Sequence, residues 1–220
     1  MKISTYLFFL ALLLTFQSFG QDIEEKTEFI LNSDQVLEVD KRDKETKGTR
    51  YVNTKFYYGN IAGSNKNVLF KFDALLGEVE VKVDEKSSVY ITKKLGTKVT
   101  FLNNAYQVFK NEEGNLTYYL TSKNCNKYCL LIKENKKLDE AVIPQNGYEK
   151  YKPPTFSKTK ETFYVTFDGE NAKKIPTKKK LFYKFFGEQE KAVKSFMKKN
   201  KLKRKKKEDL EKIIIFYSNL

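Results

Sequence analysis

The stretch Glu78-Val79-Glu80-Val81-Lys82-Val83 alternates charged and apolar residues at every position. Successive side chains of a β-strand point to opposite faces, so the three valines share one face and the charges share the other. Such alternation is typical of an antiparallel strand with one face on a core and the other in water. We therefore expect a sheet with a wet face to be built around this segment.

Segments of similar length follow one another from residue 49 to residue 168, and many are bounded by Gly, Asn, Asp or Ser. Short connections between such strands predict an antiparallel meander, as a curved sheet, a half-barrel or a sandwich. No helical period is interleaved with them, which argues against a doubly wound α/β fold. The expected strands are Tyr51–Tyr58, Val68–Phe72, Glu78–Val83, Val89–Ile91, Val99–Leu102, Tyr106–Phe109, Leu116–Leu120, Leu130–Lys133 and Thr162–Phe167, with a further candidate at Gln35–Val39.

The period of the apolar residues changes after Pro176, where they recur at helical spacing. Three short amphipathic helices are expected, and helices this short need tertiary packing to be stable. The predicted fold class is thus α+β, mainly β, with a β-rich domain at residues 21–175 and a basic helical tail at 176–220. The three apolar stripes are Leu181, Phe182, Phe185 and Phe186; Ala192, Val193, Phe196 and Met197; and Leu210, Ile213, Ile214 and Tyr217.

The N-terminus has the pattern of a secretory signal peptide at residues 1–20. Lys2 precedes a largely apolar run, and small residues stand at Ser18 and Gly20 before the expected cleavage site. The apolar run is shorter than the ~20 residues of a transmembrane helix, although an uncleaved anchor is the alternative. We expect an exported protein, periplasmic or extracellular, without a membrane span after cleavage.

The chain has two cysteines, Cys125 and Cys129, in a polar turn between strand-like runs. In an oxidising compartment two thiols this close are expected to form a disulfide that closes the turn. Free thiols, a redox pair or half of a metal site are the alternatives. A redox pair usually has two intervening residues rather than three, and a metal site needs further soft ligands.

The positive charge is concentrated in the tail. The chain carries 42 Lys and Arg against 28 Asp and Glu, and residues 176–220 hold 15 of these cations and only 5 of the acids. Such a block could bind an anionic envelope component, while a solvated linker between helices is the simpler explanation. Export argues against nucleic acid as the partner. The candidate anion-binding residues are Lys198, Lys199, Lys201, Lys203, Arg204, Lys205, Lys206 and Lys207.

No catalytic, cofactor-binding or metal-binding residues are expected. The chain contains no His, which removes Ser-His-Asp and Cys-His hydrolysis, His-ligated zinc and His-ligated haem. Glu78 and Glu80 share a strand face and could form a carboxylate pair, but strand alternation alone explains their spacing.

The segment from Gly147 to Phe156 interleaves aromatic residues with lysines around Pro153 and Pro154. Such a segment could stack on bases or sugars. An extended crossing loop, stiffened by the two prolines and covering the sheet with its aromatic side chains, is the simpler interpretation.

The chain resembles a family of uncharacterised secreted proteins of Bacteroidota. The resemblance rests on the strand pair from Val68 to Lys82 and on the C-terminal pattern Phe186-Gly187-Glu188, Val193 to Phe196, Lys199 to Leu202, Asp209-Leu210 and Phe216 to Asn219. It implies a secreted or envelope-associated bacterial protein, in which the tail is a regular part of the architecture. It supplies no catalytic motif.

These features together predict an exported, non-enzymatic protein that binds a partner protein or an anionic envelope component through its basic tail. Two alternatives belong to other functional classes of protein. One is a carrier that holds an apolar ligand inside a curved sheet. The other is a hydrolase with carboxylate or Ser/Lys chemistry. A cavity in the sheet would favour the first, and a cleft with converging polar groups the second.

Overall fold

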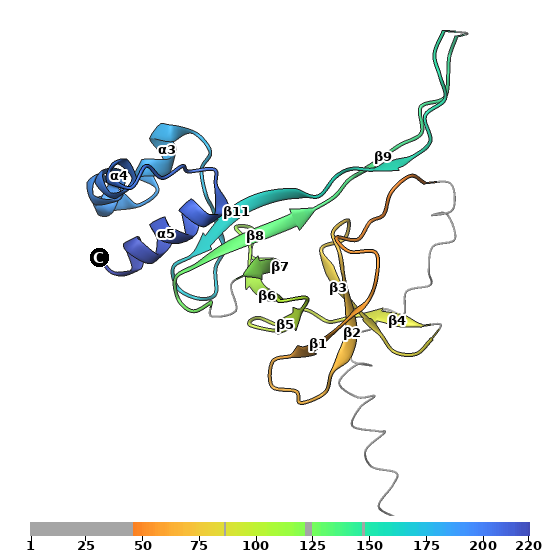
Figure 1. Ribbon diagram of the computed structural model, residues 1–220, viewed down its shortest axis with the longest axis horizontal. Coiled ribbons are helices and arrows are strands. Elements are labelled where there is room, and N and C mark those ends of the chain that lie inside the picture. The colour runs from red at the N-terminus through yellow and green to blue at the C-terminus, as the bar shows by residue number, and fades with distance from the viewer. Residues whose placement is uncertain (1–45, 86, 122–124, 147) are drawn as a thin grey trace, which may run out of the picture.

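The computed structural model describes residues 46–85, 87–121, 125–146 and 148–220. The expected signal peptide and the candidate strand at Gln35–Val39 therefore lie outside the described residues. The fold is mainly β: a ten-stranded antiparallel sheet is curved into a half-barrel, and short helices follow at the C-terminus (Figure 1). The strands of this sheet are β1 (Tyr57–Ile61), β2 (Val68–Asp73), β3 (Glu78–Lys82), β4 (Ser88–Tyr90), β5 (Lys98–Phe101), β6 (Asn104–Lys110), β7 (Leu116–Thr121), β8 (Cys129–Asn135), β11 (Lys160–Thr166) and β12 (Lys173–Lys174).

The strand order is β12-β11-β8-β7-β6-β5-β1-β2-β3-β4. Two meanders are thus joined where β5 pairs with β1 rather than with β4, which precedes it in the chain. Between β8 and β11 the chain leaves the sheet and forms a separate two-stranded ribbon from β9 (Leu138–Asp139) and β10 (Thr155–Phe156). The antiparallel meander predicted from the sequence is confirmed, and these two short strands were not anticipated.

The first strand differs from its prediction. The sequence indicated a strand at Tyr51–Tyr58, whereas β1 begins only at Tyr57, passes through Gly59 and pairs with both β2 and β5. A Cβ atom at this glycine would lie 2.1 Å from the carbonyl oxygen of Thr100 and 2.7 Å from the Cβ of Phe101. Glycine therefore allows the close approach of β5 at the junction of the two meanders, rather than ending a strand.

One face of the sheet carries a continuous apolar core. Phe70 and Phe72 on β2 lie opposite Val81 and Val79 on β3, and all four are buried. The same alternation places Tyr106 of β6 on this face, with its ring 4.4 Å from that of Phe72. The valine face inferred from the Glu78–Val83 pattern is therefore the core face of the half-barrel.

The C-terminal helices cover part of this core face. They are α3 (Lys179–Lys184), the 3-10 turn η2 (Gly187–Gln189), α4 (Glu190–Lys199) and α5 (Lys207–Ser218), and α5 lies against β8. The predicted stripes point inward except at Leu181, which is 51% exposed. Their buried members, which join the core of the sheet, are Phe182, Phe186, Val193, Met197, Leu210, Ile213 and Ile214. None of the helices in the described residues is long and apolar enough to cross a bilayer.

α3 ends at Lys184, with Phe185 as its C-cap, so the sequence-based prediction of a C-cap at Gly187 is wrong by two residues. Gly187 instead begins η2. Its φ of 56° lies in the left-handed region, which an L-residue with a side chain seldom adopts. The chain can therefore turn sharply from α3 into α4, and Phe182 and Phe186 pack edge to face with ring centroids 5.4 Å apart.

Candidate functional site

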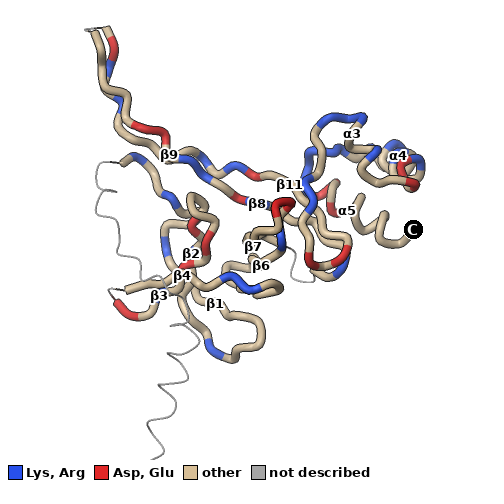
Figure 2. The backbone as a smooth tube through the Cα atoms, turned by 180° about the vertical axis from the view of Figure 1, so that it is seen from behind, with Lys and Arg blue, Asp and Glu red and all other residues tan. Residues whose placement is uncertain are grey.

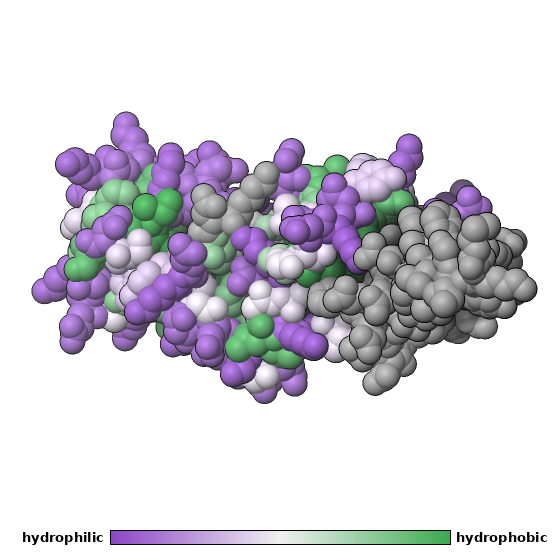
Figure 3. All heavy atoms as spheres, turned by 90° about the horizontal axis from the view of Figure 1, so that it is seen from below, coloured by the Kyte–Doolittle hydropathy of each residue, from purple (hydrophilic) through white to green (hydrophobic). Residues whose placement is uncertain are grey.

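The eight predicted anion-binding residues lie in one continuous segment at the surface. Lys198 and Lys199 end α4, the residues from Lys201 to Lys206 connect the helices, and Lys207 begins α5. Six of the eight are exposed, while Arg204 and Lys207 are half-buried. Figure 2 shows this connection as a blue stretch beside α3 and α4, and Figure 3 shows hydrophilic side chains gathered at the end that carries the helices. The exposed residues are Lys198, Lys199, Lys201, Lys203, Lys205 and Lys206.

This connection is held by specific backbone contacts. The N–H of Leu202 donates to the carbonyl oxygen of Met197 at 3.0 Å, and the N–H of Lys203 donates to Oδ2 of the buried Asp209 at 2.8 Å. Nε of Arg204 donates to the carbonyl oxygen of Thr177 at 3.1 Å, which ties the connection to the start of the tail. The lysines therefore extend from an ordered backbone.

Few of these cations are neutralised inside the molecule. Among the residues that the structure describes, one ion pair involves the eight, between Nζ of Lys206 and Glu208 at 3.8 Å. Both side chains are more than half exposed, and an exposed pair of this kind contributes little. Further exposed lysines on α3, Lys179, Lys180 and Lys184, enlarge the positive surface. The arrangement suits an extended anionic surface better than a single small anion.

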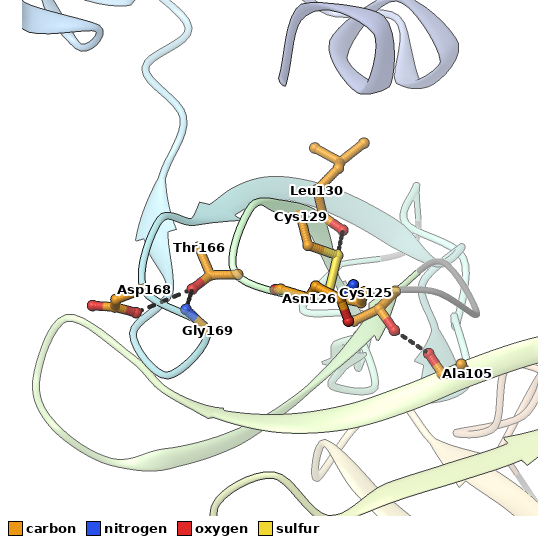
Figure 4. The surroundings of a disulfide bond; sticks show 9 residues. Ala105, Cys125, Asn126, Cys129, Leu130, Thr166, Asp168 and Gly169 are labelled. Atoms are coloured by element: carbon orange, nitrogen blue, oxygen red, sulfur yellow. Dashed lines mark hydrogen bonds between the residues drawn. A yellow bond between two sulfur atoms is a disulfide. The ribbon is translucent and has the colours of Figure 1, made fainter. Parts of the chain in front are cut away.

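The two cysteines form a disulfide in the turn that leads into β8, with an S–S distance of 2.17 Å (Figure 4). Cys129 is buried, and Cys125 is half-buried. Next to the bridge, the ring of Tyr128 packs edge to face on Phe167 and Tyr217, at 6.2 and 6.1 Å between centroids. The closed turn therefore contacts both the end of β11 and α5.

A cluster of buried charges lies on the other face of β2, β3 and β4, where the sequence predicted contact with water. Asp73 is fully buried, and its Oδ2 lies 2.7 Å from Nε of Arg50 and accepts a hydrogen bond from the Tyr90 hydroxyl at 2.6 Å. Its Oδ1 accepts the backbone N–H groups of Leu75 and Leu76. The prediction of a wet face is wrong here, because the segment around residues 50–56 folds over these strands.

Lys71 and Glu80 lie beside each other in the same cluster. Nζ of Lys71 is 3.5 Å from the centre of the Tyr51 ring and 4.3 Å from that of Phe56, and 3.9 Å from Oε2 of Glu80. Burial lowers the pKa of Lys71, and the two neighbouring carboxylates oppose this change. The aromatic rings and Glu80 replace part of the hydration that the ammonium loses.

Glu78 and Glu80, the carboxylate pair considered from the sequence, have separate partners. Glu78 is paired with Lys93, and Glu80 accepts a hydrogen bond from the Ser88 hydroxyl at 2.5 Å. The structure thus brings a serine, a carboxylate and Lys71 together, which the sequence spacing could not reveal. Ser88, Glu80 and Lys71 are each at most 9% exposed. They therefore lie beneath the segment that carries Tyr51 and Phe56 and not at the surface.

A cavity of about 200 Å³ lies between α5 and strands β6 to β8. Its volume is below the range of roughly 300–1,000 Å³ typical of small-molecule sites. No group of three or more Asp, Glu or Cys residues suited to a metal ion occurs in the described part of the chain. The cavity is lined by Asn103, Asn104, Leu120, Thr121, Leu130, Ile132, Lys207 and Glu211.

No protein family model, curated protein or solved structure matches this chain.

Proposed function

We propose that this chain is an exported, non-enzymatic protein of the bacterial envelope, and that its C-terminal helices bind an anionic envelope component. The observation that carries the proposal is the ordered segment from Lys198 to Lys207, in which six lysines are exposed and one ion pair, Lys206 with Glu208, is formed among the described residues. Phosphorylated lipid head groups and acidic polysaccharides are ligands of matching charge.

The packing of the helices supports a binding role for the segment over that of a solvated linker. A linker needs no defined conformation, whereas here the backbone between α4 and α5 is fixed through Leu202, Lys203 and Arg204. Because the backbone is already fixed, less conformational entropy is lost when a ligand binds. The lysine side chains are thus displayed together on one end of the molecule.

The buried polar clusters support the non-enzymatic part of the proposal. Glu78 is engaged by Lys93, and Glu80 by Ser88 and Lys71. Buried groups that already have partners stabilise the native arrangement, and a reaction at this cluster would require the covering segment around Tyr51 to open. The cavity beside α5 gives the carrier alternative little support, because it is small and partly lined by charged and amide side chains.

The test is co-sedimentation of the mature protein with vesicles of phosphatidylglycerol and phosphatidylcholine, and with vesicles of phosphatidylcholine alone. We expect binding to the anionic vesicles and its loss on replacing Lys203, Arg204, Lys205 and Lys206 with Gln. A matched control replaces four exposed lysines of the β-rich domain with Gln and should bind like the parent. These control positions are Lys55, Lys66, Lys94 and Lys137.

Equal binding by the parent and the tail variant would contradict the proposal, and so would the absence of binding to anionic vesicles at physiological salt. If the tail variant and the control lose vesicle binding equally, the total charge of the protein, and not the helical surface, is responsible for the binding.

A further inference from the structure

The ribbon between β8 and β11 extends away from the rest of the molecule. At its base, β9 pairs with β10, and Lys47 exchanges backbone hydrogen bonds of 2.8 Å with Pro154 and Phe156. Farther out, Val142 and Lys152 are joined by two backbone hydrogen bonds of 2.9 and 3.1 Å. Figure 1 shows the ribbon and the helices at opposite ends of the long axis, and Figure 2 shows the same from behind. We call the described residues 138–146 and 148–156 the arm.

The outer part of the arm exposes large apolar side chains. Ile143 is 73% exposed and Tyr148 is 100% exposed, while Val142 and Tyr151 are exposed by 45% and 56%. The interpretation from the sequence, in which the aromatic residues of this segment cover the sheet, is wrong for both tyrosines. Single exposed apolar residues are common on proteins, but four at the end of one projecting ribbon indicate a contact surface.

We propose that the outer arm inserts into the interface of a lipid bilayer. The chemistry of the exposed residues favours lipid over sugar. Ile143 and Val142 are aliphatic and suit the acyl region, the tyrosines have an apolar ring and a polar hydroxyl that suit the head-group level, and Lys150 and Lys152 are exposed and match lipid phosphates. Sugar stacking would use the tyrosines but leaves the aliphatic residues unexplained.

The position of the arm makes insertion possible. Because it projects as a narrow ribbon, its outer residues can reach a surface without displacing the half-barrel, and Phe156 at its base is buried and fixes the ribbon to the body. The exposed Glu149 is the acid nearest the two lysines along the chain, and its carboxylate accepts the backbone N–H of Gln145 at 3.2 Å. The Glu149 carboxylate is thus engaged by the backbone of the outer turn itself.

The chain contains no Trp, so one introduced tryptophan is an unambiguous fluorescent reporter. Tyr148→Trp places it at a fully exposed site, and Tyr58→Trp on β1, where the parent tyrosine is 73% exposed, is the matched control. We expect phosphatidylcholine vesicles to shift the emission of the Tyr148→Trp protein to shorter wavelength, in low and in high salt, and to leave that of the Tyr58→Trp protein unchanged.

A second substitution tests the aliphatic contribution. Ile143→Ser in the Tyr148→Trp background should weaken partitioning by about tenfold, because the apolar surface that enters the bilayer is lost. Leu76→Ser, at a side chain 50% exposed in the turn between β2 and β3, should leave partitioning unchanged. Both sites are exposed, so neither variant is expected to unfold the protein.

Three results would overturn the proposal. They are an emission that no vesicle shifts, equal shifts at positions 58 and 148, and a shift that follows protein concentration without vesicles, which would identify a second copy of the chain as the partner. Neutral vesicles at high salt suppress binding through the basic helices. A negative result for insertion of the arm can therefore be told apart from a negative result for anion binding by the helices.

Discussion

Asp73 is the residue at which the buried polar contacts of β2 and β4 converge. Its carboxylate is paired with Arg50, accepts the Tyr90 hydroxyl, and caps the backbone at Leu75 and Leu76. Removing one partner of a buried pair leaves the other charge without compensation, which costs more than the pair itself contributes. Asp73 therefore holds the segment around Arg50 on the outer face of the sheet.

Asp73→Asn should lower the free energy of unfolding by about 3 kcal/mol, because Arg50 loses its countercharge in a partly buried position. Urea denaturation monitored by circular dichroism measures this change. Glu113→Gln in an exposed turn is the control, with an expected change within about 0.5 kcal/mol. If the two variants are equally stable, the buried contacts of Asp73 do not hold the segment around Arg50 on the sheet.

Glu134 on β8 is a half-buried carboxylate, and the hydroxyl of Tyr106 donates a hydrogen bond to it at 2.7 Å. Burial raises the pKa of Glu134, and Glu161 adds to this, while Tyr106 and Lys207 oppose it. A carboxyl with a raised native pKa binds its proton more tightly in the folded state than in the unfolded state. Falling pH therefore stabilises the fold through the window between the unfolded pKa and the raised native pKa.

Glu134→Gln removes this ionisable group and keeps an oxygen that can accept from Tyr106. We expect the variant to be more stable than the parent at pH 7, and this advantage to shrink as the pH falls toward ~4, near the ordinary pKa of a glutamate. Unfolding in urea at several pH values measures the difference. An advantage that stays constant over this range would show that the ionised form of Glu134 carries no penalty.

Among the elements, α5 has one buried apolar face and one exposed face. Leu210 and Ile214 are 1% and 2% exposed in the core beneath the helix, while Ile215 is 62% exposed. Leu210→Asp and Ile214→Asp should each lower the free energy of unfolding by more than ~2 kcal/mol, since a charge is buried without a partner. Ile215→Asp is the matched control and should change it little.

Thermal or chemical unfolding of these variants measures the docking of the last helix. If the changes at positions 210 and 214 are as small as the change at 215, α5 does not stabilise the half-barrel, and the tail would be an appendage rather than a packed layer.

The disulfide between Cys125 and Cys129 spans a sequence separation of four residues. A loop this short removes little conformational entropy from the unfolded chain, so reduction should lower stability only toward the low end of the ~0–5 kcal/mol range. Mass spectrometry of exported protein purified without reductant should show the two residues joined to each other. Free thiols in that material would contradict both the bridge and the expected oxidising compartment.

In the whole molecule, the periodicity of apolar residues predicted the antiparallel meander and the C-terminal helices, while it left a curved sheet, a half-barrel and a sandwich open. Val79 and Val81 on one face, and Leu210 and Ile214 at helical spacing, are placed by local geometry that repeats along the chain. The role of Gly59 was not recoverable, because it depends on how closely β5 approaches.

The candidate site was predictable only in part. The basic segment is visible as composition, since its residues are contiguous. The contact between Arg50 and Asp73 joins positions 23 residues apart, and the burial of Glu80 depends on a covering segment that alternation cannot foresee. The exposure of Tyr148 likewise follows from where the arm projects, which is a property of the assembled fold.

If the segment from Lys198 to Lys207 binds anions as a group, the affinity of the protein for anionic vesicles must depend strongly on salt. Charges beyond a screening length of ~10 Å at 0.1 M salt interact weakly, so binding through many exposed lysines must weaken steeply as salt is raised. We expect a steep fall in affinity for the parent between low and physiological salt, and a much shallower one when Lys203, Arg204, Lys205 and Lys206 are replaced by Gln. Equal salt dependences for the two proteins would show that this segment does not bind the vesicles.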